Sequence, residues 1–365
     1  MKFRCERDVL VDALTTASRA TSGRERMPVL AGARLEISGD RLYVKATDLD
    51  LTIEVEATVA GIADGVTVIP AKLAADIVRA LEPGAVTVEA DADEARIASG
   101  RSQFAVRVLP ADEFPKLLGP PSDDAVVVAA GELADALRQV VRAASSDEGR
   151  PPLTGVLVAA MEGGVQLAAT DSYRLAMRDL PGVRLVREDQ RVLIPSRALG
   201  ELLRVLSTAG EVAIRLGTTD ASFEIGAVRL TTRLIEQEFP NVKQIIPSSY
   251  PNKLTVGRGA LLDALKRVKL LVRDQNTPVK LALRPDGVEL TVTNPAEGTA
   301  TEDVEAKYEG VEMTMAFNPT YLIEGIEAIT ADEITLETVD ALKASTLRGA
   351  DKNDYLYLLM PVRVP

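Results

Sequence analysis

The chain carries the same pattern of residues three times, and this repeat is the feature that most limits its fold. Three marks return in the same order at offsets of 123 to 128 residues. They are Val11-Asp12-Ala13-Leu14 with Ala134-Asp135-Ala136-Leu137 and Leu262-Asp263-Ala264-Leu265, Thr47-Asp48 with Thr170-Asp171 and Thr293-Asn294, and Ile69-Pro70 with Ile194-Pro195 and Asn318-Pro319. A period of about 125 residues is too long for a solenoid repeat, so each copy is expected to be a domain with its own core.

Turn-forming segments separate the copies. Gly119-Pro120-Pro121-Ser122-Asp123-Asp124 and Pro247-Ser248-Ser249-Tyr250-Pro251-Asn252 lack the periodicity of helices or strands. We therefore expect three domains, at residues 1–121, 122–248 and 249–365.

Each copy has the pattern of an α+β domain in which helices pack on antiparallel sheets. A first helix is indicated by apolar stripes at Leu133, Leu137, Val140 and Ala144, and at Leu261, Leu265, Val268 and Val272. Second helices are expected over 71–81, 196–206 and 319–329, where a proline directly precedes or begins each segment. Hairpin turns are expected at 38–40, 162–164 and 285–287. The predicted order in a copy is strand, helix, several strands, helix, several strands.

The composition excludes many catalytic sites. The 365 residues contain no histidine, which removes Ser-His-Asp and Cys-His nucleophile systems and histidine-containing zinc sites. No phosphate-binding loop motif is present. Cys5 alternates with Phe3 on an expected strand and is interpreted as a small core residue. We expect no catalytic residues, no metal site and no cofactor.

Localisation is expected to be cytoplasmic. The longest apolar runs, such as Val156 to Met161, are too short to cross a bilayer, and the first eight residues lack the apolar core of a signal peptide. A single cysteine agrees with a reducing compartment.

Charge gives conflicting indications about nucleic acid. The net charge of -12 argues against tight binding to phosphates, whereas the first helix of the third copy carries Arg258, Lys266, Arg267, Lys269 and Arg273 against Asp263. On a helix, Arg258, Lys266, Lys269 and Arg273 would share one face. Two interpretations are open: a solvated surface, or a cationic surface for a polyanion.

Two apolar segments lack an obvious partner. Leu270 and Leu271 lie off the core stripe of their helix, and either a neighbouring element or a second subunit could cover them. The apolar C-terminal segment is expected to form a core strand up to Leu359, and Met360-Pro361-Val362 could line a groove.

These features together resemble the bacterial DNA polymerase III β subunits, the sliding clamps. The resemblance covers the whole chain and is carried by the threefold repeat, by residues 168–176 (AATDSYRLA), by residues 317–322 (FNPTYL) and by residues 357–363 (YLLMPVR). It implies three tandem clamp domains per chain and a head-to-tail homodimer that forms a six-domain ring around duplex DNA. It further implies a processivity factor without catalytic activity, whose partners are a clamp loader, the replicative polymerase and other proteins with a clamp-binding motif, and which has no contact with a membrane.

The resemblance also implies a pocket for partner peptides between the second and third domains. By position, its residues are Leu153, Thr154, Gly155, Thr170, Ser172, Tyr173, Arg174, Leu175, Pro240, Ile245, Asn318, Tyr321, Leu358, Met360, Pro361, Val362 and Arg363. Many relatives have Gly-His or a similar pair where this chain has Ser172-Tyr173, and a leucine ending where it has Val364-Pro365, so peptide preference is expected to differ.

DNA contacts and the subunit interface follow from the same resemblance. The DNA-binding candidates are Arg24, Arg138, Arg142, Arg150, Lys266, Arg267 and Lys269. Leu270 and Leu271 match an apolar pair at the subunit interface of the family. A β-rich binding scaffold unrelated to DNA is the alternative from another class, because the residues alone show a repeat and no chemistry.

Overall fold

A computed structural model describes the chain except for residues 23–26, 122–123, 188–189, 207–209, 275–276 and 364–365. The described residues form two compact units. Unit 1 contains Met1–Glu132 and Ala198–Leu234, and unit 2 contains Leu133–Arg197 and Ile235–Pro365. None of the helices in these described residues is both long and apolar enough to cross a membrane.

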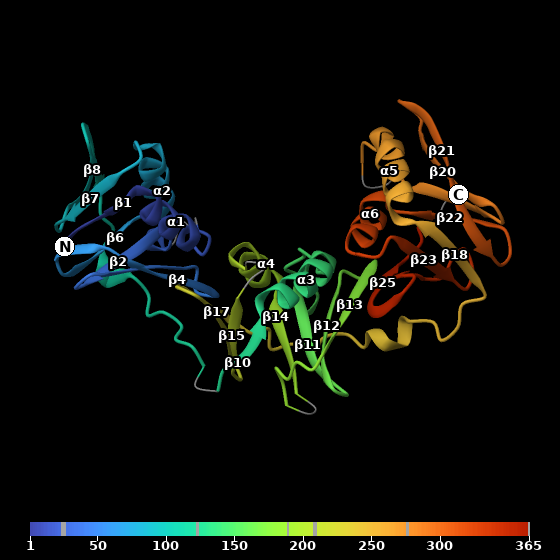
Figure 1. Cartoon of the computed structure of the whole chain (residues 1–365), viewed down its shortest axis with the longest axis horizontal. Helices are drawn as coiled ribbons and strands as arrows, with labels where there is room; N and C mark the ends of the chain where they lie inside the picture. Colours follow the sequence, from blue (N-terminus) through green and yellow to red (C-terminus); the bar gives the residue numbers. More distant parts are fainter. Residues whose placement is uncertain (23–26, 122–123, 188–189, 207–209, 275–276, 364–365) are drawn as a thin grey trace. The chain divides into compact units, whose positions relative to one another are not determined.

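Unit 1 contains a five-stranded and an eight-stranded antiparallel sheet (Figure 1). The five-stranded sheet has the order β5-β1-β7-β8-β9 and consists of β5 (Ala60–Ala63), β1 (Lys2–Glu6), β7 (Ala85–Ala90), β8 (Glu94–Ser99) and β9 (Ser102–Arg107). The eight-stranded sheet, in spatial order, consists of β10 (Val126–Ala129), β15 (Glu211–Leu216), β16 (Asp220–Ile225), β17 (Val228–Arg233), β4 (Leu51–Thr58), β3 (Arg41–Thr47), β2 (Gly32–Ser38) and β6 (Gly65–Pro70). Helices α1 (Arg7–Ser18) and α2 (Ala71–Ala80) pack against each other in this unit.

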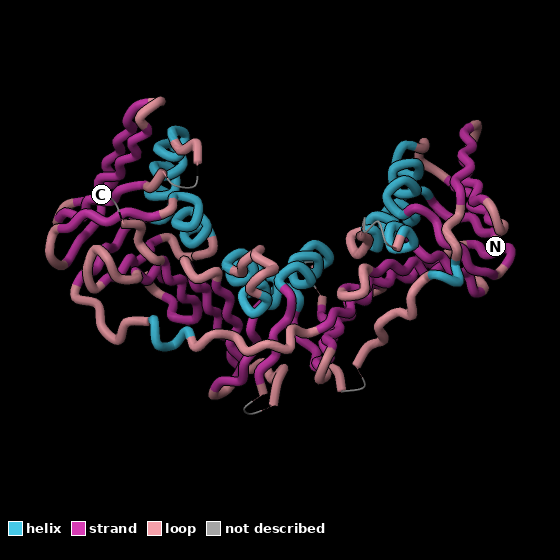
Figure 2. The backbone as a smooth tube through the Cα atoms, turned by 180° about the vertical axis from the view of Figure 1, so that it is seen from behind, coloured by secondary structure: helices cyan, strands magenta, loops and turns pink. Residues whose placement is uncertain are grey.

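Unit 2 is built on one twelve-stranded sheet. In spatial order it consists of β14 (Arg191–Pro195), β11 (Gly155–Met161), β12 (Gly164–Thr170), β13 (Arg174–Pro181), β25 (Lys352–Leu359), β24 (Ser345–Gly349), β23 (Glu333–Thr338), β18 (Asn252–Gly257), β21 (Gly298–Glu309), β20 (Gly287–Asn294), β19 (Val279–Arg284) and β22 (Met313–Phe317). The helices α5 (Arg258–Val268) and α6 (Pro319–Glu327) pack against each other. In the view of Figure 2, α5 and α6 lie along one side of the strands of this unit.

The remaining helices connect these sheets. Helix α3 (Ala130–Val140) begins at the end of unit 1 and continues into unit 2, and α4 (Ser196–Val205) leads back into unit 1. Short 3₁₀ helices lie in the connections: η1 (Pro28–Ala31), η2 (Ala111–Glu113), η3 (Val141–Ala143), η4 (Pro151–Thr154), η5 (Val242–Ile245) and η6 (Lys269–Leu271).

The predicted order of elements is present in each copy. Strand β1, helix α1, strands β2–β6, helix α2 and strands β7–β9 have their counterparts from β10 to β17 and from β18 to β25. The sheets cross the boundaries between copies, since β4 pairs with β17 from Leu51↔Thr232 to Val55↔Val228, and β13 pairs with β25 from Arg174↔Leu359 to Arg178↔Tyr355. Each compact unit therefore combines strands from two copies.

The predicted core stripes are buried where the helices extend. Leu133, Leu137 and Val140 are buried in α3, and Leu261, Leu265 and Val268 in α5. Two details of the prediction were wrong. Helix α3 ends before Ala144 and α5 ends before Val272, because each helix is followed by a 3₁₀ turn, η3 and η6 respectively. Cys5 is buried on β1 as expected, and burial raises the pKa of its thiol to about 12.

Candidate functional site

The predicted peptide pocket lies in unit 2, at the seam where β13 pairs with β25. Strand β12 ends at Thr170, whose hydroxyl donates to the carbonyl oxygen of Arg174 at 2.6 Å. The carboxylate of Asp171 then accepts the backbone N–H groups of Tyr173 and Arg174 at 2.9 and 3.0 Å. This short turn sends the chain back as β13, and the Thr-Asp mark found in the sequence is what builds it.

The turn places Ser172 in a left-handed conformation. Its φ angle is 83°, and Leu49 at the matching place in the first copy has a φ of 84°. A residue with a side chain adopts this conformation at a cost of about 1 kcal/mol or more, which glycine avoids. A residue other than glycine at this position therefore strains the backbone but places a side chain at the rim of the seam. Here the hydroxyl of Ser172 accepts a hydrogen bond from Arg150 at 3.1 Å.

Arg174 is the buried centre of the seam. Its guanidinium pairs with Asp171 at 3.0 Å, pairs with Glu324 on α6, donates to the carbonyl oxygen of Arg142, and lies 4.2 Å from the centre of the Tyr321 ring. Burial acts to lower the pKa of Arg174, but its interactions with Tyr357 and Glu324 outweigh burial and leave that pKa raised. The charge is therefore fixed, and Arg174 links β13 to α6 and η3.

Helix α6 is held at its start by Asn318. The side-chain oxygen of Asn318 accepts the backbone N–H groups of Thr320 and Tyr321 at 2.9 and 3.2 Å, and Pro319 occupies the first helical position. This cap orients Tyr321 beneath Arg174, while the hydroxyl of Tyr357 donates to the carbonyl oxygen of Tyr321 at 2.9 Å. Asn318, which the family resemblance placed in the pocket, thus caps the start of α6.

Apolar side chains remain exposed above this framework. Tyr173 is 61% exposed, Ile245 48%, and Met360 and Val362 38% each. Backbone hydrogen bonds hold three of these residues in place. The N–H of Met360 donates to the carbonyl oxygen of Tyr173 at 2.9 Å, and that of Val362 donates to the carbonyl oxygen of Ala316 at 2.7 Å. Exposed apolar side chains on a rigid base are typical of a surface that binds a protein segment.

The predicted pocket residues divide into two groups. The exposed or half-buried ones are Thr154, Ser172, Tyr173, Pro240, Ile245, Asn318, Tyr321, Met360, Pro361, Val362 and Arg363. The buried ones are Leu153, Gly155, Thr170, Arg174, Leu175 and Leu358. Leu175 and Leu358 belong to one apolar cluster with Val242 and Met177, so they support the surface from below. Asp171, Glu324 and Tyr357 also hold the seam, and only Asp171 had a sequence signal, the repeated Thr-Asp mark.

A cavity of about 630 Å³ is lined by residues of β11, β12 and β14 and by the segment 235–243. Of the predicted pocket residues, only Pro240 lines it. Most of its polar side chains, among them Glu162, Glu236 and Lys243, are exposed. The cavity therefore has one residue, Pro240, in common with the predicted pocket.

Five of the seven predicted DNA-binding residues are paired with carboxylates within the chain. Arg138 pairs with Asp135 at 2.5 Å, Arg150 with Asp147 at 2.8 Å, and Arg267 with Glu302 at 2.8 Å. Arg142 and Lys266 both pair with Glu327, at 3.5 and 3.1 Å. Arg24 lies outside the described residues. Hydrogen bonding between Arg267 and Glu302 raises the pKa of the arginine and lowers that of the glutamate.

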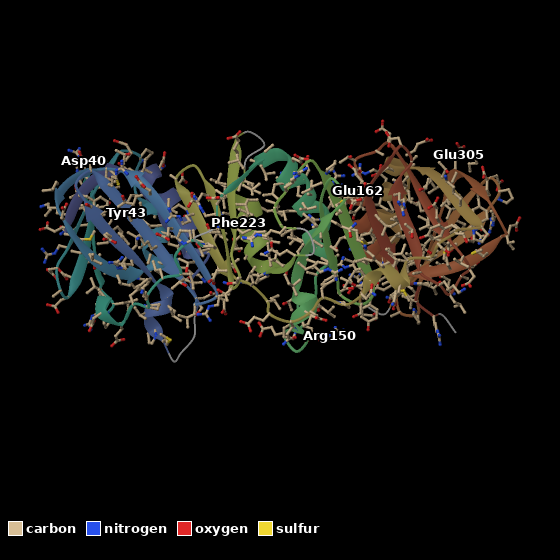
Figure 3. All side chains as sticks on the ribbon, turned by 90° about the horizontal axis from the view of Figure 1, so that it is seen from below. Asp40, Tyr43, Arg150, Glu162, Phe223 and Glu305 are labelled. Atoms are coloured by element: carbon tan, nitrogen blue, oxygen red, sulfur yellow. The ribbon has the colours of Figure 1, made fainter. Side chains whose placement is uncertain are left out.

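The single basic face expected on the third copy's first helix was wrong. Helix α5 ends at Val268, so Lys269 belongs to η6 and Arg273 lies beyond it. Arg258 is used internally, because its guanidinium donates to the carbonyl oxygens of Ile326 and Glu327 at 3.1 and 3.2 Å. Arg150 lies in the segment before η4 (Figure 3). Its guanidinium donates to the hydroxyl of Ser172.

The apolar pair Leu270 and Leu271 lies in η6. Leu270 is 75% exposed, the most exposed large apolar side chain among the described residues, and Leu271 is half-buried. The carbonyl oxygen of Leu271 accepts a hydrogen bond from Asn294 at 3.0 Å, which fixes the turn and holds Leu270 outward. Among the described residues, no group of three or more Asp, Glu or Cys side chains is arranged to hold a metal ion.

Comparison with known proteins gives consistent matches along the chain. Residues 1–118, 127–241 and 243–363 match the models for the N-terminal, central and C-terminal domains of the DNA polymerase III beta subunit. A beta sliding clamp from Streptomyces coelicolor is 32% identical over 382 residues, covering 100% of both chains.

Solved structures of similar proteins match the fold over the full length. The DNA polymerase III beta subunit of Bartonella birtlesii, solved with bound griselimycin, has a TM-score of 0.94 and 30% identity, with 100% of each chain covered. The DNA polymerase sliding clamp of Bacillus subtilis has a TM-score of 0.92 and 29% identity, again with 100% of each chain covered.

Proposed function

Because the chain belongs to the DNA polymerase III beta subunit family, the β sliding clamps, we propose that it is a processivity factor that encircles duplex DNA as a head-to-tail homodimer. The ring would contain six domains, bounded in each chain at residues 1–121, 122–248 and 249–365. It catalyses no reaction and works in the cytoplasm on chromosomal DNA. The observation that carries this proposal is the match of three consecutive family domains along one chain.

The surface charge agrees with a topological link to DNA. The chain has a net charge of -12, and five of the cations assigned to DNA are paired with carboxylates of the same chain: Arg138, Arg142, Arg150, Lys266 and Arg267. Such a surface binds phosphates weakly and in a salt-dependent way. A closed ring needs no strong contacts, because it leaves circular DNA only by opening, and weak contacts leave it free to slide.

The exposed apolar side chains at the β13–β25 seam are proposed to bind partner peptides. Tyr173, Ile245, Met360 and Val362 would supply the apolar anchors, and Arg174 would keep the base of the site rigid. The replicative polymerase, a clamp loader and other proteins with short peptides rich in glutamine, leucine and phenylalanine would bind here. A few aromatic and methionine side chains above a buried base are the usual arrangement for such anchoring.

The test of the central proposal is topological. The purified protein is loaded onto nicked circular DNA by the cognate loader, washed in high salt, and its retention is measured before and after the circle is cut. We expect retention on the circle and release from the linear form, because only a closed ring is held without charge contacts. Equal retention on both forms would show binding by contact, and no retention with an active loader would favour the scaffold alternative.

A further inference from the structure

The last turn of α6 attracts three cationic side chains in unit 2. Arg258 donates to the carbonyl oxygens of Ile326 and Glu327, as expected at a helix C-terminus, where unpaired carbonyls carry partial negative charge. Lys266 on α5 and Arg142 on η3 pair with the Glu327 carboxylate, one on each oxygen. Glu327 thus connects two cations that come from the second and third copies of the repeat.

Helix stability does not account for this glutamate. A negative side chain in the last turn is opposed by the helix dipole, and exposed ion pairs contribute little to folding. The pairs are exposed here, since the side chains of Arg142 and Lys266 are 62% and 53% accessible. The main effect of Glu327 is therefore on the electrostatic surface that these two cations present to a ligand.

We propose that Glu327 weakens the affinity of this helical surface for DNA by competing with phosphates for Arg142 and Lys266. This inference rests on the proposed DNA-facing role of those two residues. A phosphate that approaches either cation must displace the carboxylate or remain close to a like charge. Low affinity would favour sliding in a ring that is already held on the duplex topologically.

Glu327 differs from the other carboxylates on this surface. Asp135 and Glu302 each hold one of the DNA-binding candidates, Arg138 and Arg267, in a one-to-one pair. Glu327 pairs with two of the candidates, Arg142 on η3 and Lys266 on α5. Its neutralisation therefore releases two cations at once and removes one negative charge between them.

The test compares Glu327→Gln with the unaltered homodimer. Affinity for a short linear duplex is measured by fluorescence anisotropy at several salt concentrations between about 50 and 200 mM, where phosphate contacts have a strong effect. We expect binding to tighten about threefold to tenfold and the salt dependence to steepen by about one to two phosphate contacts. Glu162→Gln gives the same change in net charge in the turn between β11 and β12 (Figure 3), and should leave affinity unchanged.

A second pair of variants separates this inference from the proposal on which it rests. Arg142→Ala with Lys266→Ala should weaken binding, and adding Glu327→Gln to that double variant should restore little. If the double variant binds like the unaltered protein, the two cations do not contact DNA, which refutes both their proposed DNA-binding role and the competition by Glu327. If the double variant weakens binding but Glu327→Gln alone has no effect, only the competition by Glu327 is refuted. An equal gain with and without the cations would mean general charge repulsion and would also refute it. Thermal unfolding of each variant confirms that the fold is intact.

Discussion

Residues at the β13–β25 seam fall into two groups according to their exposure. Thr170, Arg174, Leu175 and Leu358 are buried and fix the backbone, whereas Tyr173 and Met360 are exposed and joined by a backbone hydrogen bond. A ligand that lies on this surface meets the second group directly. The exposed side chains are therefore the ones whose truncation changes binding with the smallest effect on folding.

We predict that Tyr173→Ala with Met360→Ala abolishes peptide binding and leaves the dimer intact. Loss of two apolar anchors should cost about 2 kcal/mol or more of binding free energy, at least a factor of about 30 in affinity. Titration of a short labelled peptide containing glutamine, leucine and phenylalanine measures this, and sedimentation measures the dimer. The matched control is Val127→Ala, an exposed apolar residue on β10 in unit 1. Unchanged affinity in the double variant would show that the peptide does not bind at this seam.

Residue roles were predictable from the sequence only where the partner lies nearby along the chain. The repeated Thr-Asp mark coincides with the end of β12, where the Asp171 carboxylate accepts the backbone N–H groups two and three residues later. The pairing of Lys266 with Glu327 and of Arg267 with Glu302 joins residues far apart in sequence, so no local pattern reveals it. The sequence therefore located the cations but could not show that carboxylates already hold them.

At the scale of elements, helix starts were more predictable than helix ends. The proline near the start of α2, α4 and α6 fixes where each begins, and the observed starts at Ala71, Ser196 and Pro319 match the prediction. The end of α5 depends on packing against β20 and β21 and on the change to η6, which an apolar stripe does not reveal. For that reason the predicted basic face was extended beyond the real helix.

Helix α6 offers a prediction about its N-terminal cap. Asn318→Ala leaves the first N–H groups of α6 without the side-chain oxygen, and should lower the free energy of unfolding by about 1 kcal/mol. Because Tyr321 lies in the same turn and supports Arg174, peptide affinity should fall as well. Urea unfolding and peptide titration measure the two effects. Asn318→Ser keeps a capping oxygen and should lose much less of both; equal losses in the two variants would contradict the capping role.

At the scale of the whole molecule, the proposed ring needs a subunit interface, and Leu270 and Leu271 in η6 are the residues that we propose for it. Leu270 is 75% exposed in the single chain, and its turn is fixed by the hydrogen bond from Asn294 to Leu271, so folding of the chain gives it no partner. Burial of such a side chain against a second subunit contributes about 1.5 to 3 kcal/mol. In a homodimer with two equivalent interfaces, this contribution is made twice.

We therefore predict that Leu270→Ala with Leu271→Ala gives folded monomers that are no longer retained on circular DNA. The secondary structure should be unchanged because Leu270 lies outside the core, and Leu271 is only half-buried. Sedimentation over a dilution series measures the dimer, and the circular-DNA assay measures closure. Leu342→Ala, which truncates an exposed leucine between β23 and β24, is the control and should leave both unchanged. A dimer that survives dilution in the double variant would place the subunit interface elsewhere, whereas a monomer that still binds peptide would show that the peptide surface is complete within one chain.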